Sequence, residues 1–241
     1  MSRAIQSWSA THPGTVRTQN QDACLCRPEI GLFAVADGVG GHSGGEVASR
    51  QVMAMLNAIP GTIPPAARLA AVRAGLQQAH EHLLQSPAAT GPAIAPATTV
   101  VVLMLHEGHF ACLWAGDSRA YLLRDGQLCR LTTDHSVVQD LVNSGALTEA
   151  EADQDPRQHV ITRAIGAGEQ ELQIEKTVGE VLSQDRFLLC SDGLYKTLEA
   201  ETITGMLALA EDSVGDAAER LIHAALAHCA RDNVTAVIAA P

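Results

Sequence analysis

Residues 98–131 read TTVVVLMLHEGHFACLWAGDSRAYLLRDGQLCRL, and this stretch indicates a β-sheet fold. It contains four apolar runs, at 98–105, 109–115, 119–124 and 127–131. Glu107-Gly108 and Asp125-Gly126 each separate two of these runs, at positions where tight hairpin turns need residues that tolerate a positive φ. The stretch therefore predicts four consecutive strands in an antiparallel meander.

The rest of the chain adds further strands and one-sided helices. Apolar runs predict strands at 31–36, 186–190 and 234–239. Apolar residues at helical spacing predict helices at 46–59, 65–85 and 214–229, each with one apolar face. The segment 87–97, rich in proline and alanine, predicts a loop. A layered sandwich with sheets inside and helices outside buries all these elements at once, so we expect an α+β fold.

Length and composition favour a single domain over residues 1–241 and argue against some classes of function. The chain has 241 residues, 46% of them hydrophobic, which suits one large core. The formal net charge of −11 argues against a nucleic-acid partner, because phosphate backbones select surfaces rich in Lys and Arg. The longest strongly apolar stretch, 99–105, is too short to cross a bilayer, and residues 1–6 lack the layout of a signal peptide. We therefore expect a cytoplasmic protein without a membrane segment.

Cysteine and histidine spacings do not indicate a zinc site. The six cysteines are scattered without a C-x-x-C pair, which is typical of reduced thiols. His80, His82, His106 and His109 lack the i, i+4 spacing of paired zinc ligands on a helix. We expect all four histidines at the surface.

Aspartates stand at the ends of several predicted strands. Asp37, Asp117 and Asp192 each end an apolar run, Asp232 precedes one, and Asp22 precedes another candidate strand. Neighbouring antiparallel strands finish and start side by side, so these carboxylates can meet at one end of the sandwich. Taken singly, an Asp-Gly after a strand is as often only a turn. Together, however, such carboxylates repel one another unless a cation is bound, and oxygen ligands select Mg²⁺, Mn²⁺ or Ca²⁺.

Six motifs occur in order along the chain and carry a family resemblance. They are RTQNQD at 17–22, ADGVGGH at 36–42, AGDSR at 115–119, LTTDHS at 131–136, CSDGL at 190–194 and RDNVT at 231–235. With these motifs the chain, over about residues 10–239, resembles the bacterial type 2C, or PPM, protein phosphatases. The resemblance implies a four-layer αββα sandwich, in which two antiparallel sheets flanked by helices hold a two-metal centre in a cleft at one end.

The resemblance also implies a set of metal ligands. Asp37 would bridge two Mn²⁺ or Mg²⁺ ions, the Gly38 carbonyl would help to hold one, and Asp192 and Asp232 would complete the other. Asp22 would support the centre through water, and Asp117 would bind a third, weaker ion. Two such ions lower the pKa of a bridging water and stabilise its attack on phosphorus.

Other residues are expected to act on the substrate. Arg17 would grip the phosphoryl oxygens with its planar, charged fork; the alternative is a surface salt bridge. His42 either protonates the departing serine oxygen or caps the following helix. Residues 133–168 predict a flap that carries Arg163 as a substrate-binding residue and sets substrate choice.

The function expected from these features is the hydrolysis of phosphoserine and phosphothreonine on cytoplasmic proteins. A eukaryote-like Ser/Thr kinase would be the opposing partner, and the chain is expected to be a monomer. One alternative is a non-catalytic module of the same fold that only binds phosphoproteins. Another is a two-metal nuclease, which would need a basic track that the acidic composition does not favour.

Overall fold

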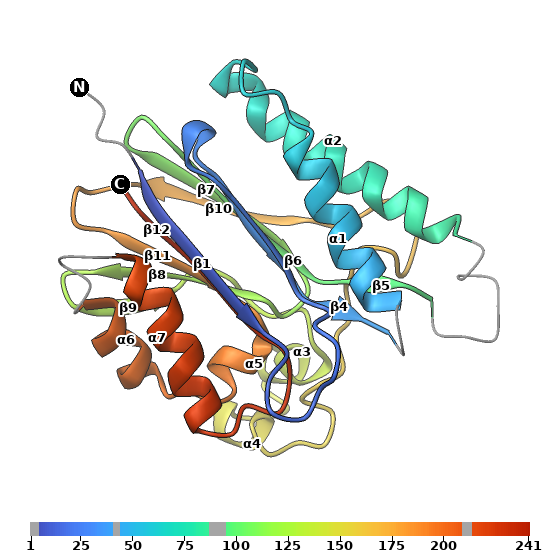
Figure 1. Cartoon of the computed structure of the whole chain (residues 1–241). Coiled ribbons are helices and arrows are strands. Elements are labelled where there is room, and N and C mark those ends of the chain that lie inside the picture. Colours follow the sequence, from blue (N-terminus) through green and yellow to red (C-terminus); the bar gives the residue numbers. More distant parts are fainter. Residues whose placement is uncertain (1–4, 41–43, 87–94, 209–213) are drawn as a thin grey trace.

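Two five-stranded antiparallel sheets form the centre of the structure, which is a computed structural model (Figure 1). It describes residues 5–40, 44–86, 95–208 and 214–241. The first sheet has the strand order β1, β12, β11, β8, β9. Its strands are β1 (Gln6–His12), β12 (Val234–Ala240), β11 (Arg186–Cys190), β8 (Arg119–Arg124) and β9 (Gln127–Arg130).

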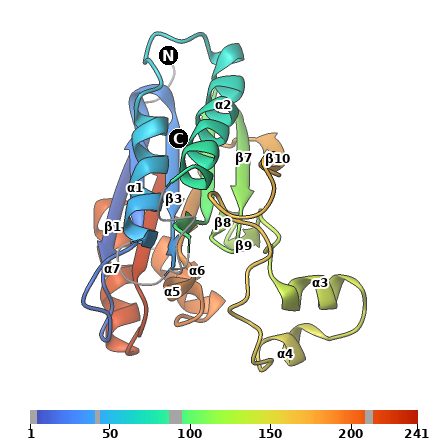
Figure 2. The same ribbon diagram turned by 90° about the vertical axis from the view of Figure 1, so that its right-hand side faces the viewer.

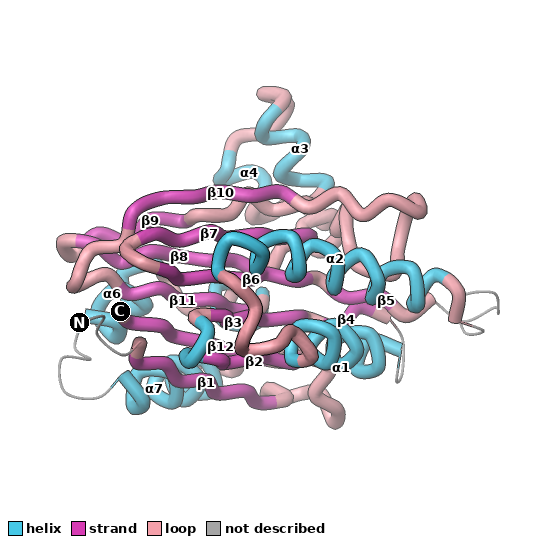
Figure 3. Tube along the Cα trace, turned by 90° about the horizontal axis from the view of Figure 1, so that it is seen from above, coloured by secondary structure: helices cyan, strands magenta, loops and turns pink. Residues whose placement is uncertain are grey.

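The second sheet has the order β10, β7, β6, β3, β2. Its strands are β10 (Glu175–Glu180), β7 (His109–Ala115), β6 (Val100–His106), β3 (Leu32–Ala36) and β2 (Ala23–Arg27). A separate two-stranded pair is formed by β4 (Gly38–Val39), which follows β3 in the chain, and β5 (Ala97–Thr98), which precedes β6. The strands of both sheets are aligned along nearly the same axis, as Figure 3 shows.

Helices cover the outer face of each sheet. The helices α1 (Gly44–Asn57) and α2 (Pro65–Leu84) pack on the second sheet, and α6 (Ala200–Ala208) and α7 (Val214–Ala227) pack on the first. A turn of 3-10 helix, η1 (Pro28–Ile30), joins β2 to β3. Three separate apolar cores fill the space between the four layers. The predicted αββα sandwich is therefore confirmed.

The position of strand β6 between two apolar cores explains why its residues 100–105 are all apolar. Val100, Val102 and Met104 pack in the core beneath α1 and α2. Val101, Leu103 and Leu105, on the opposite face, pack in the core between the two sheets. Since successive side chains point to opposite faces, a strand between two cores needs apolar residues at every position.

The predicted four-stranded meander is wrong in one respect. Strands β6 and β7 pair within the second sheet, whereas β8 and β9 pair within the first. The chain crosses between the sheets at Gly116, whose φ of 111° lies in the region that favours glycine. A Cβ on Gly116 would lie 2.6 Å from Thr99. The crossing lets β8 pair with β11 instead of β7, and it leaves Asp117 between the sheets.

The predicted flap forms a subregion of its own. It contains α3 (Val137–Asn143) and α4 (Glu149–Ala152), which extend away from the sandwich in Figure 2. His80, expected at the surface, is instead buried beneath the end of this segment, where its Nδ1 accepts from the Gly166 N–H at 3.0 Å. His82, His106 and His109 are exposed as predicted. Within the ranges described above, no helix combines the length and apolar character needed to span a membrane.

Candidate active site

The sheet topology brings the predicted carboxylates to one end of the sandwich. Strands β3 and β7 both pair antiparallel with β6, so Asp37 and Asp117 follow strands that end on the same side. Asp192 follows β11, and Asp232 lies two residues before β12, which pairs antiparallel with β11. The convergence expected from the sequence is therefore present.

Asp37 is the electrostatic centre of this group. Burial is the largest cause that raises its pKa well above the ordinary value, and the charges of Asp22, Asp192, Asp117 and Asp232 raise it further. Its backbone is held at both ends: the amide donates to Thr99 Oγ1 at 3.1 Å, and the carbonyl accepts from the Thr99 amide at 2.9 Å. The backbone of Asp37 is thus held in place, and its carboxylate lies among other acids.

Gly38 follows Asp37 at a close approach between backbones. A Cβ at this position would lie 2.3 Å from the carbonyl oxygen of Gly45 in α1. The Gly38 amide donates to the Gln21 carbonyl at 3.2 Å. Only glycine lets the chain run this close to α1, so the requirement for glycine is steric.

Asp22 lies beneath the group and is almost fully buried. Its Oδ2 accepts from Ser191 Oγ at 2.7 Å and from Thr235 Oγ1 at 2.6 Å. Its Oδ1 has no hydrogen-bond partner among the described residues. Burial raises its pKa to about 7, although the two hydroxyl groups act in the opposite direction.

Asp232 and Arg17 form a bidentate ion pair. Arg17 Nε and Nη2 donate to the two carboxylate oxygens at 2.9 and 2.8 Å. Burial is the largest effect on Asp232 and raises its pKa, but the hydrogen bonds from Arg17 and the Asn233 amide, together with the charges of Arg17 and Lys196, hold this pKa below the ordinary value. The Arg17 side chain is 58% exposed, so this contact matches the surface salt bridge considered as its alternative role.

Lys196 is a site residue that the sequence interpretation missed. Its Nζ lies 2.7 Å from Asp192 Oδ2 and 3.6 Å from Asp117 Oδ2. It follows the short helix α5 (Asp192–Tyr195), in which Asp192 stands four residues earlier, and the i, i+4 spacing from Asp192 of the CSDGL motif to Lys196 just after it was the available signal. Burial raises the pKa of Asp117 to about 6, and Lys196 partly opposes this shift.

A second cluster anchors the start of the flap next to this site. Arg119 donates to both oxygens of Asp134, with Nη2 to Oδ2 at 2.6 Å, and its guanidinium lies 3.6 Å from the centre of the Tyr195 ring. His135 Nδ1 accepts from the Gly116 amide at 3.1 Å. These contacts join the LTTDHS motif to the loop that carries Asp117. Asp134 and His135 therefore hold this loop in position.

Two other predicted site residues have different outcomes. Arg163 Nη1 lies 3.0 Å from Glu175 Oε1 and 3.3 Å from His135 Nε2, so it joins the flap to the edge strand β10. Its role in substrate binding stays a prediction. His42 lies outside the described residues.

The donor set suits hard divalent ions. Carboxylate oxygens and a backbone carbonyl are the ligands that Mg²⁺ and Mn²⁺ prefer, and the unpartnered Asp22 Oδ1 offers an acceptor to a coordinated water. Among the described residues, no three Asp, Glu, His or Cys side chains are arranged as a ready metal-binding cluster. Mg²⁺ sites commonly use one or two carboxylates and several waters, so an open arrangement fits the ion.

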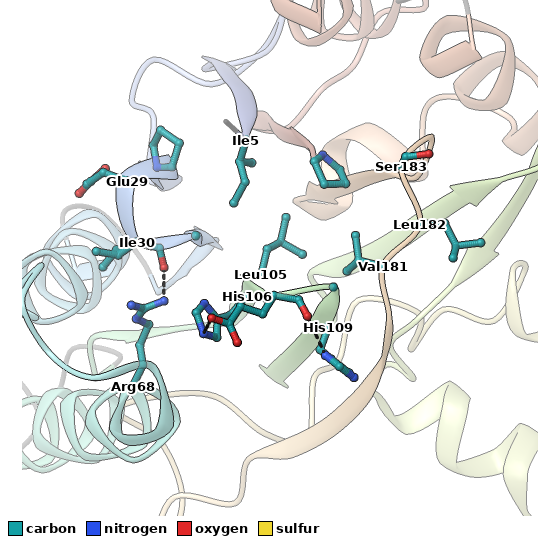
Figure 4. Close-up of a pocket in the computed structure, with 15 residues that line it drawn as sticks. Ile5, Glu29, Ile30, Arg68, Leu105, His106, His109, Val181, Leu182 and Ser183 are labelled. Carbon is teal, nitrogen blue, oxygen red and sulfur yellow. Dashed lines mark hydrogen bonds and ion pairs between the residues drawn. The ribbon is translucent and has the colours of Figure 1, made fainter. Parts of the chain in front are cut away.

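Two hollows border the carboxylates, and a third lies far from them. One, of about 670 Å³, is lined by Arg17, Asp192, Lys196 and Asp232. Another, of about 660 Å³, lies between Asp117 and the flap. The third, of about 780 Å³, opens at the opposite ends of β3, β6 and β7, around Arg68, His106 and His109 (Figure 4). Since the carboxylates line the first two, we place the active-site cleft there.

The pKa of Asp22 leads to a stability prediction for the metal-free chain. The pKa of Asp22 is ordinarily 3.8 and is about 7 in the folded chain. The contribution of the protonated carboxyl to the free energy of unfolding is therefore fully present below about pH 4, and it is lost as the pH rises to about 7. Asp22→Asn should remove this loss while still accepting hydrogen bonds from Ser191 and Thr235. In excess chelator, the difference in Tm between the variant and the wild type should grow by on the order of 5 °C in favour of the variant from pH 5 to pH 8.

Thermal melts of both proteins across this pH range test the prediction. A comparison at or below about pH 4 is the internal control, because there the wild-type carboxyl is protonated in the folded chain and the stability is still complete. A difference in Tm that does not change with pH would show that the charge of Asp22 is not costly in the fold.

Known proteins are similar to the chain along nearly its whole length. The family model described as Protein phosphatase 2C matches residues 14–229. The serine/threonine protein phosphatase PstP of Mycobacterium tuberculosis is 39% identical over 230 residues, which cover 94% of this chain. The serine/threonine phosphatase Stp of Listeria welshimeri is 28% identical, with 95% of this chain and 92% of that protein covered. The chain spans only 43% of the length of the mycobacterial protein.

Solved structures have the same fold. PppA of Pseudomonas aeruginosa superposes with a TM-score of 0.88 at 36% identity, covering 99% of this chain and 98% of that one. The catalytic domain of PstP, in complex with two manganese ions, superposes with a TM-score of 0.86 at 34% identity, covering 98% and 97%. The residues that the family model matches include Asp22, Asp37, Asp117 and Asp192.

Proposed function

The chain belongs to the protein phosphatase 2C family, and from this premise we propose that it hydrolyses phosphoserine and phosphothreonine esters on other proteins. The observation that carries the proposal is the group of acids that surrounds Asp37 at one end of the two sheets, beside a cleft. Asp37, Asp192, Asp232 and the Gly38 carbonyl would hold two Mn²⁺ or Mg²⁺ ions, with Asp22 supporting them through water. The two manganese ions in the PstP catalytic domain support this choice of cofactor.

The chemistry divides between the ions and the side chains. When bound, the ions lower the pKa of a water molecule and neutralise charge on the phosphoryl group. Hydrolysis forms a bond from phosphorus to the water oxygen and breaks the bond to the serine or threonine oxygen, which takes up a proton. We propose His42 as a candidate donor of that proton, with capping of α1 as its alternative role.

Arg17 would move from Asp232 to the phosphate during binding. Its guanidinium is planar and permanently charged, so the fork that now holds two carboxylate oxygens fits two phosphoryl oxygens equally well. The pair is exposed and therefore weak, on the order of 1 kcal/mol or less, so releasing it costs little.

Arg17→Ala tests this role. Loss of a charge-assisted hydrogen bond to phosphate, worth about 1.5–3 kcal/mol, should raise KM by about 10- to 150-fold and change kcat less. Steady-state kinetics on a phosphothreonine peptide provide the measurement. Arg50→Ala is the matched control, because Arg50 is also exposed and paired with a carboxylate, that of Glu46. An unchanged KM in the Arg17 variant would leave Arg17 with its salt bridge alone.

We propose that the flap at 133–168, with Arg163, contacts the residues that flank the phosphoserine. Arg163→Ala should then lower kcat/KM on a phosphoprotein by about 10-fold or more and on p-nitrophenyl phosphate by less than about 2-fold, since one lost charged contact amounts to about 1.5–3 kcal/mol. Glu175→Gln is the matched control, because it breaks the same ion pair but keeps the arginine. Equal losses in both variants, together with a lowered Tm, would assign the pair a purely structural role.

The phosphoester must be supplied by an enzyme that phosphorylates serine or threonine. We propose a eukaryote-like Ser/Thr kinase as that partner, phosphorylated proteins of the cytoplasm as the substrates, and a monomer as the working form. The names of the related serine/threonine phosphatases support the substrate class.

Turnover separates the proposal from its alternative, a module that only binds phosphoproteins. Phosphate release from phosphoserine and phosphothreonine peptides is measured at fixed excess Mn²⁺, with peptide binding followed in parallel. We expect many turnovers per chain. Tight peptide binding without phosphate release would favour the non-catalytic module.

A further inference from the structure

Lys196 lies between two carboxylates that come from different sheets. Asp192 follows β11 of the first sheet, and Asp117 follows β7 of the second. The Nζ of Lys196 is 2.7 Å from an oxygen of Asp192 and 3.6 Å from an oxygen of Asp117. One ammonium group therefore faces both acids, in the position where a divalent ion would otherwise bridge them.

The surroundings hold this lysine in place. Its side chain is 24% exposed, and its Nζ is also 3.3 Å from Nδ1 of the flap residue His159. The preceding residue, Tyr195, donates from its hydroxyl to the Asp117 carbonyl at 3.0 Å. The Tyr195 ring is in turn covered by Arg119, which is bound to Asp134. The backbone that carries Lys196 is thus tied to the loop that carries Asp117.

Lys196 supplies the positive charge that faces Asp117. Arg119, the arginine next to this site, is occupied by Asp134 in a bidentate pair. Among the described residues, Lys196 is the cation within ion-pair distance of Asp117. It also opposes the effect of Asp192 on the pKa of Asp117.

An ammonium and a divalent ion exclude each other at this position. An ion bound to Asp117 Oδ2 and Asp192 Oδ2, the two oxygens that Nζ faces, would lie about 2 Å from each and would take the place of Nζ itself, whereas an ion of the main centre can bind Asp192 through Oδ1. Like charges that compete for one position repel strongly in a partly buried site. Lysine also provides only donors, so it cannot serve as a ligand.

Resting on the proposed function, we infer that the Lys196 ammonium takes the place of a third divalent ion between Asp117 and Asp192. The chain then holds two Mn²⁺ ions, where the family resemblance predicts a third at Asp117. Because the lysine is covalently part of the chain, its positive charge remains at the site whatever the supply of metal.

Counting bound metal tests the inference without reference to activity. Equilibrium dialysis against excess Mn²⁺, with metal measured by atomic absorption, should give two ions per chain for the wild type and for Lys196→Arg. Lys196→Gln should give three, because the charge is gone and the two acids remain. The double variant Lys196→Gln with Asp117→Asn should return to two.

The remaining outcomes are equally distinct. Lys196→Met serves as a second neutral variant should the glutamine variant fold poorly, since it keeps an unbranched chain against Tyr195. Three ions in the wild type, or two in every folded neutral variant, would overturn the inference and leave the proposed function standing. A wild-type chain that binds no Mn²⁺ would overturn both.

Discussion

Asp37→Asn is expected to lower kcat/KM on a phosphoserine peptide by about 1,000-fold or more while the protein stays folded. Asp37 is the acid whose charge is opposed by four others, Asp22, Asp192, Asp117 and Asp232, so it is central to any ion they hold. Loss of this one carboxylate weakens metal binding, and about 4 kcal/mol of lost transition-state stabilisation corresponds to roughly three factors of ten in rate. The same change relieves repulsion among the acids, so the Tm in chelator should be unchanged or higher.

Asp125→Asn provides the control for this prediction. Asp125 is also followed by glycine at the end of a strand, but it lies in the β8–β9 hairpin with a φ of 51°, a conformation that asparagine tolerates. This variant should retain wild-type activity. Near wild-type rates for Asp37→Asn at saturating Mn²⁺ would contradict the metal assignment.

Removal of metal is expected to abolish activity completely. Excess EDTA should reduce phosphate release to background, because the acids of the site cannot by themselves neutralise an incoming phosphate and would instead repel it. Mn²⁺ or Mg²⁺ should restore the rate. Ca²⁺ should restore it poorly, since its larger and looser coordination shell positions the attacking water badly.

The readout is the initial rate after titration of each ion into the chelated protein. A melting curve in chelator serves as the control, and it should show a folded chain, because the three apolar cores do not depend on the carboxylates. Full activity in excess chelator would rule out the proposed mechanism.

The sequence alone determined the positions of most strands and of the acids at their ends. The runs that form β7, β8 and β11 were predicted with their observed limits, because apolar periodicity and Asp-Gly or Glu-Gly turns are properties of adjacent residues. The polar edge strands β1 and β10 were not predicted, since the alternating residues of β10 (EKTVGE) contain no apolar run. An edge strand of this kind is specified by its neighbour: β10 by β7 and β1 by β12.

The side chains that meet at the site could be identified only from the packing of distant segments. No local pattern indicated that the meander would divide at Gly116 and leave Asp117 beside α5, because a glycine that allows a turn does not specify which sheet follows it. The pairing of Arg17 with Asp232 joins residues 215 positions apart, and that of Lys196 with Asp117 joins two sheets. Local patterns place a charge on a strand or helix end, but its partner is set by packing between distant segments, and this packing brought a lysine to the acid where a metal ion was expected.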